Sequence, residues 1–186
     1  MKRSFDLVLG LILIVLFSIP MILVAFSIRL TSNGPILYWS QRIGKYNKIF
    51  EMPKFRTMII TTPEVATHLV QNPKKYLTPI GGFLRKYSLD ELPQLFSIIK
   101  NDMSFVGPRP ALFNQVDLIN KRNDFEIEKI LPGLTGWAQI NGRDDISLEE
   151  KVILDFEYFK KSSFCFDLLI LWLTFIKVIK RDGISH

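Results

Sequence analysis

Residues 86–110 read KYSLDELPQLFSIIKNDMSFVGPRP, and the interpretation of this stretch decides how the whole chain is understood. Its acidic pair, Asp90 and Glu91, stands where a helix is expected to start, and the apolar residues that follow have the spacing of an amphipathic helix. Ser88 and Glu91 fit the capping-box pattern, which would give the pair an ordinary structural role. Pro93 lies just beyond the first turn of such a helix and is expected to bend it. The alternative is a catalytic role for the pair.

The composition indicates one folded domain, with or without an appendage, that binds an anionic partner. The chain has 186 residues, is 48% hydrophobic and carries a net charge of +6. Such a charge favours nucleic acid, anionic lipid or a phosphorylated ligand. One cysteine, Cys165, and two histidines, His68 and His186, make a typical zinc site and histidine-based acid–base catalysis improbable.

The N-terminal segment points to a membrane. Residues 7–28, LVLGLILIVLFSIPMILVAFSI, contain no charged side chain and would span ~33 Å as one helix, enough to cross a ~30 Å hydrocarbon core. A signal peptide is disfavoured because the apolar run exceeds the usual length. A transmembrane helix and a re-entrant helix remain as alternatives. Ser18 and Pro20 favour a break near the middle of the run, since proline removes a backbone hydrogen bond and a serine hydroxyl can bind a freed carbonyl. Basic residues on both flanks favour a helix whose two ends lie on the cytoplasmic side.

Beyond the turn at residues 32–35, the sequence predicts an α+β domain. Two β-favouring stretches, 36–40 and 48–55, predict a hairpin. Helices are predicted from Thr62 to before residue 73, from Ser147 to about residue 161, and over about 166–180, where the helix suits either the core or a membrane interface. Residues 131–143 predict a loop or short strands.

Basic side chains beside glycine and proline suggest a site for an anionic ligand. Arg109 stands between two prolines, which stiffen its backbone, and arginine suits bidentate binding of phosphate. The other candidate binding residues are Lys54, Arg56, Arg85 and Arg143. A carboxylate that approaches a diphosphate needs compensation from Mg²⁺, arginines or a helix N-terminus. One carboxylate of the acidic pair would then attack phosphorus while the other holds the metal. An aspartate with an ordinary pKa of ~3.9 is already ionised for that attack.

Three motifs resemble the bacterial sugar transferase family, the small monotopic phosphoglycosyl transferases. They are PKFRTM (53–58), SLDELPQLFSIIKNDMSFVGPRPAL (88–112) and LPGLTGWAQINGR (131–143), which occur in the family's order after the apolar N-terminal helix. The family often has adjacent Ser and Pro in that helix, whereas Ile19 separates Ser18 from Pro20 here.

The resemblance implies a re-entrant membrane helix over residues 1–33 and a mostly helical cytoplasmic catalytic domain over 34–186, with a small hairpin and interfacial amphipathic helices. It implies location at the bacterial inner membrane, with the catalytic domain on the cytoplasmic face. Asp90 would be the nucleophile and Glu91 a metal ligand, with Asp90 also near the Mg²⁺. Arg85, Arg109 and Arg143 would contact phosphates or nucleotide.

The reaction implied by the resemblance is transfer of sugar-1-phosphate from a UDP-sugar to polyprenyl phosphate, with release of UMP through a phosphosugar–aspartyl intermediate. It would initiate cell-surface glycan assembly. Overall similarity favours an N-acetylated amino sugar, and nucleic acid is not an expected partner. Two alternatives stay open: a non-catalytic membrane adaptor that binds anionic lipid, and a glycosyltransferase that releases UDP.

Overall fold

The computed structural model describes residues 1–62, 73–142 and 146–180 of the chain. The helix predicted after Thr62 and the candidate residue Arg143 lie outside the described residues.

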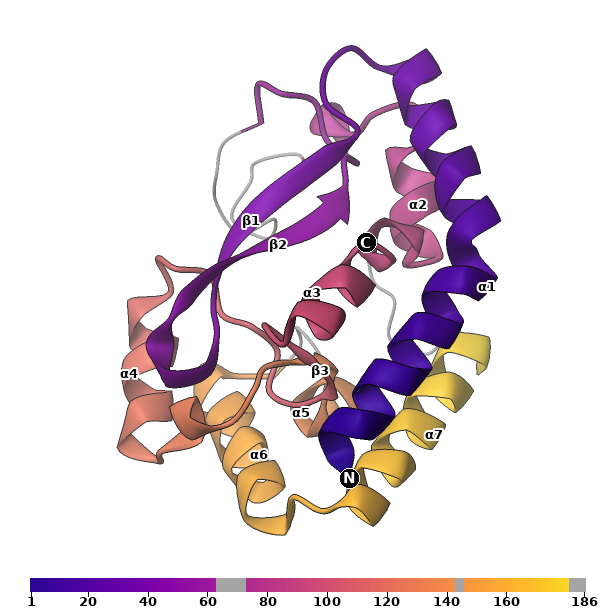
Figure 1. Cartoon of the computed structure of the whole chain (residues 1–186). Coiled ribbons are helices and arrows are strands. Elements are labelled where there is room, and N and C mark those ends of the chain that lie inside the picture. The colour runs from indigo at the N-terminus through magenta and orange to yellow at the C-terminus, as the bar shows by residue number, and fades with distance from the viewer. Residues whose placement is uncertain (63–72, 143–145, 181–186) are drawn as a thin grey trace.

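Over these described residues the fold is mostly helical, with two small sheets (Figure 1). The helices are α1 (Lys2–Thr31), α2 (Gly81–Lys86), α3 (Gln94–Lys100), α4 (Val116–Asp124), α5 (Trp137–Asn141), α6 (Leu148–Lys161) and α7 (Phe164–Lys180). The strands are β1 (Leu37–Ile43), β2 (Ile49–Phe55), β3 (Ser104–Val106) and β4 (Gly133–Thr135). The predicted α+β class, with its hairpin and its C-terminal helices, is confirmed.

The antiparallel hairpin of β1 and β2 places two basic side chains on one face. Its register sets Arg42 opposite Phe50 and Tyr38 opposite Lys54. Side chains alternate between the faces of a strand and directly paired residues share a face, so Arg42 and Lys54 project to the same side. Met52, between them in the register, is buried in the core with residues of α3. The hairpin therefore presents its cations toward the interior of the molecule.

A second, parallel pair of strands was not predicted. Ser104 of β3 lies opposite Gly133 of β4, and Val106 lies opposite Thr135. The backbones approach so closely that a Cβ atom at Gly133 would lie 2.1 Å from the nitrogen of Gly107, which explains glycine at this position. The described part of this segment, residues 131–142, thus forms a short strand, as expected, followed by a helix, α5, that the sequence analysis missed.

Helix α1 is one helix from Lys2 to Thr31 with Pro20 in its interior, and its axis changes direction between its two ends (Figure 1). The Ser18 hydroxyl donates to the carbonyl of Val15 (2.7 Å). It does not reach the carbonyl of Leu16, whose usual helical donor is the N–H that proline lacks. The expectation that Ser18 satisfies the freed carbonyl is therefore wrong. The helix is long and apolar enough to cross a membrane by length and composition.

Polar contacts tie the start of α1 to the rest of the fold. Lys2 Nζ donates to the hydroxyl of Tyr158 (3.0 Å) and to Asp167 (2.5 Å). The buried carboxylate of Asp6 accepts from the Ser104 hydroxyl (2.8 Å). The guanidinium of Arg3 donates to the backbone carbonyls of residues 98 and 99 at the end of α3.

The other end of α1 is tied to the same domain. The guanidinium of Arg56, which follows β2, donates to the backbone carbonyls of Ser32 (3.0 Å) and Asn33. Figure 1 shows α1 along one whole edge of the molecule, beside α3. Between its ends the helix exposes a stripe of large apolar side chains, namely Val8, Leu11, Ile12, Val15, Leu16, Ile19, Ile22, Leu23, Phe26 and Leu30.

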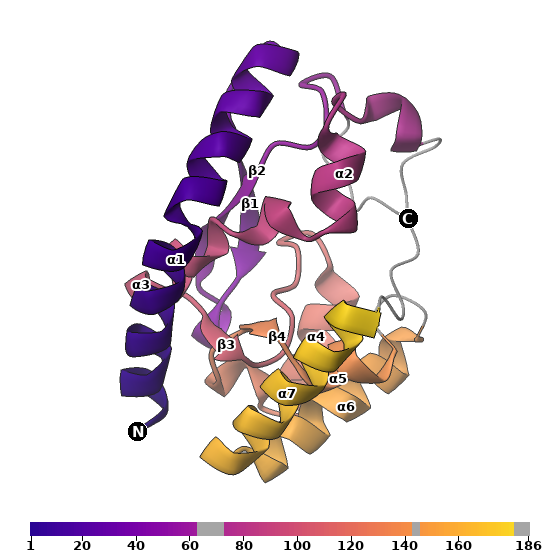
Figure 2. The ribbon, with the colours of Figure 1, turned by 90° about the vertical axis from the view of Figure 1, so that its right-hand side faces the viewer.

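Helix α7 combines the two roles that the sequence left open. Ile170 is fully buried in the core, and the helix packs over β3, β4 and α5 (Figure 2). Trp172 and Phe175, whose rings stack with centroids 6.0 Å apart, are exposed on the other side. One face of α7 therefore belongs to the core, and the other has the aromatic character of a membrane interface.

Candidate active site

The acidic pair lies on a separate single turn in front of α3. This turn, η4 (Leu89–Glu91), is a 3₁₀-helix, and α3 begins only after Pro93, which occupies its N-cap. Ser88 precedes η4 with a left-handed φ of 52° and makes no side-chain cap hydrogen bond. The predicted capping box and the single bent helix are therefore wrong. Pro93 stands at a helix start, where its missing N–H is tolerated.

Asp90 is a buried carboxylate with an unusual proton affinity. Only 8% of the residue is exposed, and this burial raises its pKa to about 6. The positive charge of Lys54 opposes the shift, the negative charge of Glu91 adds to it, and Arg85 opposes it as well. The ordinary pKa expected from the sequence is therefore wrong. The carboxyl group is still about nine-tenths ionised at pH 7, one unit above this pKa.

Glu91 is the neighbour of Asp90 in the chain, but its pKa is shifted in the opposite direction. Its Oε1 accepts from Lys54 Nζ at 2.7 Å and from Arg109 Nη2 at 3.4 Å. Burial alone would raise the pKa of Glu91, but the charges and hydrogen bonds of Lys54 and Arg109 outweigh it and hold the pKa well below its usual range. Neighbouring carboxyl groups with pKa values pushed apart are a frequent sign of divided catalytic roles.

Arg42 belongs to the same cluster, and the sequence analysis missed its role. Its Nε donates to the hydroxyl of Ser40 (3.0 Å) and its Nη1 to the carbonyl of Pro110 (3.1 Å). Burial and the nearby charge of Arg109 lower its pKa to about 10, and Glu91 offsets the shift only in part. The hairpin pattern held the one available signal, because pairing across the strands puts Arg42 and Lys54 on one face.

The remaining candidates separate into two groups. Arg85 faces the cluster: its Nε donates to Thr57 Oγ1 at 3.0 Å, burial lowers its pKa, and the charge of Asp90 opposes that shift. Arg56 is buried and holds the end of α1, so the structure gives it an architectural position away from the acidic pair. Lys54, Arg85 and Arg109 thus surround the pair as predicted, with Arg42 in addition.

The charges of this cluster suit an anionic ligand. Arg42, Lys54, Arg85 and Arg109 carry four positive charges against the two carboxylates of the pair. Their excess of positive charge, in partly buried surroundings, favours a ligand that brings negative charge of its own.

A magnesium ion fits this arrangement only as a partner of the ligand. Among the residues that the structure describes, no three His, Cys, Asp or Glu side chains gather as a metal site. Asp90 and Glu91 supply two carboxylates, and Mg²⁺ in proteins typically binds one or two carboxylates together with substrate phosphates. The donor set therefore matches an ion that arrives with a phosphate.

The raised pKa of Asp90 makes a prediction about stability. The unfolded chain loses this proton near pH 3.8 and the folded protein near pH 6, so the stability that the group provides at low pH is lost as the pH rises through 6. Asp90→Asn removes the buried charge and should raise the stability at pH 7.5 by up to about 3 kcal/mol. Thermal midpoints of both proteins, measured from pH 4 to 8, should diverge with rising pH. A wild type more stable than the variant at pH 7.5 would contradict this account of the site.

Sequence comparison with known proteins places the chain in a family. The model of the family described as "Bacterial sugar transferase" matches residues 1–181. The uncharacterized sugar transferase EpsL of Bacillus subtilis is 40% identical over 100% of this chain and 91% of its own length. The undecaprenyl-phosphate galactose phosphotransferase of Salmonella typhimurium is 35% identical over 98% of this chain.

Coverage differs between the relatives. The chain spans 41% of the Salmonella protein, and 44% of the UDP-N-acetylgalactosamine-undecaprenyl-phosphate N-acetylgalactosaminephosphotransferase of Aeromonas hydrophila, which is 34% identical. It thus covers less than half of these two proteins and most of EpsL. The match over the whole described site confirms the resemblance inferred from the motifs, and the chain belongs to the bacterial sugar transferase family.

Proposed function

We propose that this protein transfers sugar-1-phosphate from a UDP-sugar to polyprenyl phosphate at the membrane, the first step of cell-surface glycan assembly. The names of the Salmonella and Aeromonas relatives describe undecaprenyl-phosphate sugar phosphotransferases. The observation that carries the proposal is the buried carboxylate of Asp90, which lies next to an ion-paired Glu91 within a group of cations. That arrangement suits nucleophilic attack on a diphosphate.

The proposed reaction has two displacements at one phosphorus atom. An oxygen of Asp90 forms a bond to the phosphorus that carries the sugar, and the bond from that phosphorus to the bridging oxygen breaks, so UMP leaves. A phosphate oxygen of polyprenyl phosphate then attacks the same phosphorus and releases the carboxylate of Asp90. Both nucleophiles are anions already, so neither step needs a general base, which agrees with the scarcity of histidine.

The surrounding cations reduce the repulsion between the carboxylate of Asp90 and the phosphates of the substrate. A carboxylate ~4 Å from a phosphate charge is repelled by ~4 kcal/mol at an effective dielectric of 20. Arg109, with 43% of its side chain exposed, can reach a phosphate. Lys54 and Arg42 are more buried and add positive potential from the protein side of the site. Glu91 and Asp90 would hold Mg²⁺, which would supply further neutralisation of the phosphate charge.

Product analysis tests the proposal. Purified enzyme with polyprenyl phosphate and a panel of UDP-sugars should release UMP, and we expect the panel to favour N-acetylated amino sugars. With UDP-sugar alone, the intact protein should gain the mass of a phosphosugar, and the kinetics should be ping-pong. Release of UDP would indicate a glycosyltransferase that breaks the bond between sugar and phosphate. A strict requirement for both substrates before any UMP forms would exclude the covalent route.

The adaptor alternative fits the structure less well. A protein that binds anionic lipid through its charge needs cations on its surface. Lys54 is instead mostly buried and bonded to Glu91, and Arg42 donates inward to Pro110. These cations are arranged around two carboxylates, where a lipid surface cannot reach them.

We also propose that α1 enters the bilayer from the cytoplasmic face and leaves by the same face. Its start is bonded to Tyr158 and Asp167, and its end is bonded to Arg56. All of these partners belong to the same catalytic domain, so a helix that crossed the membrane would have to lose one set of contacts. The positive residues at both flanks favour the cytoplasmic side for both ends.

Cysteine labelling provides the test for this topology. Ser4→Cys and Thr31→Cys, at exposed positions near the two ends of α1, are made separately in a Cys165→Ser background. Both cysteines should resist a membrane-impermeant thiol reagent in intact cells and react after permeabilisation. Labelling of one of them from outside would show a spanning helix and refute the proposal.

A further inference from the structure

The backbone around Arg109 is held by hydrogen bonds from several other parts of the chain. The carbonyl of Pro108 accepts from the nitrogen of Gly133 (2.9 Å), and that of Ala111 accepts from the nitrogen of Ile43 (2.9 Å). Between them, the carbonyl of Pro110 accepts from Arg42 and that of Arg109 accepts from Arg122. Each carbonyl from residue 108 to residue 111 thus has a donor outside the segment.

Arg122 is the most buried side-chain donor of this set. It comes from α4, and only 11% of its side chain is exposed. Its Nη1 donates to the Arg109 carbonyl at 2.9 Å, while its Nε and Nη2 donate to Asp155 Oδ2 at 3.0 and 2.6 Å. Asp155, on α6, is 1% exposed. The rigid fork of the guanidinium therefore has one branch on the carboxylate and one on the backbone of the proposed phosphate-binding residue.

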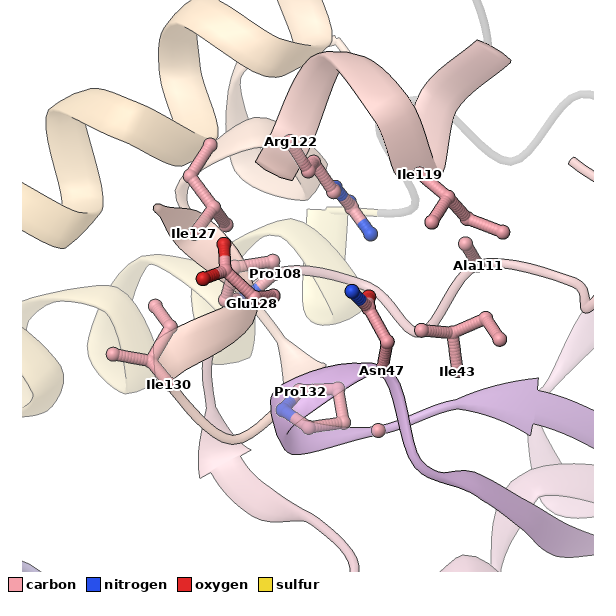
Figure 3. Close-up of a pocket in the computed structure, with 11 residues that line it drawn as sticks. Ile43, Asn47, Pro108, Ala111, Ile119, Arg122, Ile127, Glu128, Ile130 and Pro132 are labelled. Carbon is pink, nitrogen blue, oxygen red and sulfur yellow. The ribbon is translucent and has the colours of Figure 1, made fainter. Parts of the chain in front are cut away.

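The space beside this pair is too small for a ligand. Figure 3 shows the guanidinium of Arg122 directed into a pocket that Pro108 and Ala111 also line. The cavity measures about 30 Å³, far below the ~300 Å³ or more of typical ligand pockets. The ion pair of Arg122 and Asp155 therefore has a structural role and does not bind a ligand in this cavity.

Joining α4 to α6 does not explain a buried ion pair. Lys121 and Glu149 already connect the same two helices at the surface, with 2.5 Å between Nζ and Oε1. A buried ion pair often adds little or no stability over apolar side chains of similar volume. The feature that distinguishes Arg122 from Lys121 is its bond to the carbonyl of Arg109.

We propose that Arg122 and Asp155 are positioning residues, which fix the backbone of Arg109 so that its guanidinium is directed at Glu91 and at the phosphate of the substrate. Asp155 orients the fork of Arg122, and Arg122 holds the carbonyl of Arg109 between its two prolines. The role of Arg109 in this inference rests on the proposed function. Neither Arg122 nor Asp155 touches the substrate.

The test replaces both charges together, because Asp155→Asn alone would leave an uncompensated buried arginine that can unfold the protein. Arg122→Met with Asp155→Leu should keep a folded protein and lower kcat/KM for UMP release by about 10²-fold, since a small displacement of a binding group has effects of that size. The same double substitution in an Arg109→Ala background should change kcat/KM by less than about threefold, because the residue to be positioned is gone. Arg122→Lys keeps the positive charge but lacks the forked guanidinium, and it should lose activity as the double variant does.

Two control variants separate positioning from stability. Glu149→Gln breaks the surface ion pair between the same helices, and Val152→Ala creates a cavity in the core next to α4. Val152→Ala should lower the thermal midpoint without the 10²-fold loss of activity, and Glu149→Gln should change neither substantially. Equal losses of kcat/KM with and without Arg109, or the same loss in Val152→Ala, would overturn the proposal.

A measurement without substrate keeps this inference separate from the proposed function. Hydrogen–deuterium exchange of residues 107–112 should become faster in the Arg122→Met/Asp155→Leu variant and stay unchanged in Glu149→Gln. Unchanged exchange in the double variant overturns the positioning role whether or not the enzyme transfers a sugar phosphate. A wild type that releases no UMP from any UDP-sugar counts against the proposed function alone.

Discussion

Asp90→Asn should reduce the rate of sugar-phosphate transfer by about 10³-fold or more, because asparagine keeps the shape of the side chain but lacks the anionic oxygen that attacks phosphorus. The variant should also fail to gain the phosphosugar mass when it is incubated with UDP-sugar. Both effects are measured on purified protein, by UMP release and by intact mass spectrometry.

The stability of this variant separates loss of chemistry from loss of fold. Since burial raises the pKa of Asp90 to about 6, the substitution should leave the protein at least as stable as the wild type at pH 7.5. Asp124→Asn, at an exposed position at the end of α4, is the matched control and should be fully active. Near-normal turnover by Asp90→Asn would refute the proposed nucleophile.

Glu91→Gln should lower the rate by about 10²- to 10³-fold, but with the opposite effect on stability. The substitution removes the counter-ion of Lys54 and Arg109, whose cationic groups then repel each other next to Asp90. Because the folded protein holds the pKa of Glu91 well below its usual range, the ionised side chain stabilises the fold at neutral pH. We expect a loss of ~1–3 kcal/mol, visible as a lower thermal midpoint.

A double substitution distinguishes the two roles of Glu91. Lys54→Met combined with Glu91→Gln removes the ion pair as a whole and should recover part of the lost stability, since no unpaired lysine remains. Activity should stay low, because the carboxylate proposed to hold Mg²⁺ and the positive charge of Lys54 are both missing. Recovery of full activity in the double variant would show that Glu91 serves only to neutralise Lys54.

Short-range signals in the sequence predicted several elements correctly. The hairpin follows from two β-favouring stretches around a glycine-containing loop. Ser147, the predicted start of a helix, forms a capping box with Glu150 at the start of α6. Ser88 and Glu91 have the same spacing and form none, because Ser88 adopts a left-handed conformation in front of a 3₁₀ turn. A pattern of two residues therefore cannot identify a cap without the backbone conformation between them.

Long-range contacts account for the rest. The parallel pairing of β3 with β4 joins segments on either side of α4, and neither strand alone is long enough to give a periodic pattern. The sequence groups Arg56 with Lys54 because both are basic residues of the PKFRTM stretch near Pro53, but β2 ends at Phe55 and Arg56 leaves toward α1. The pKa of Asp90 depends on burial, which its neighbours in sequence do not determine.

The apolar helix completes the interior of the catalytic domain as well as offering a surface to lipid. Leu9, Leu13 and Ile14 pack against the cluster that contains Leu95 and Ile98, and Ile28 is itself fully buried beside Phe55 and Leu84. A shortened chain without α1 would expose both clusters to water. Helix α1 is therefore not a detachable module that could be removed or exchanged for another apolar helix without disturbing the core. A chain without α1 should therefore lose the packing beneath α3 and β2 together with the exposed apolar stripe.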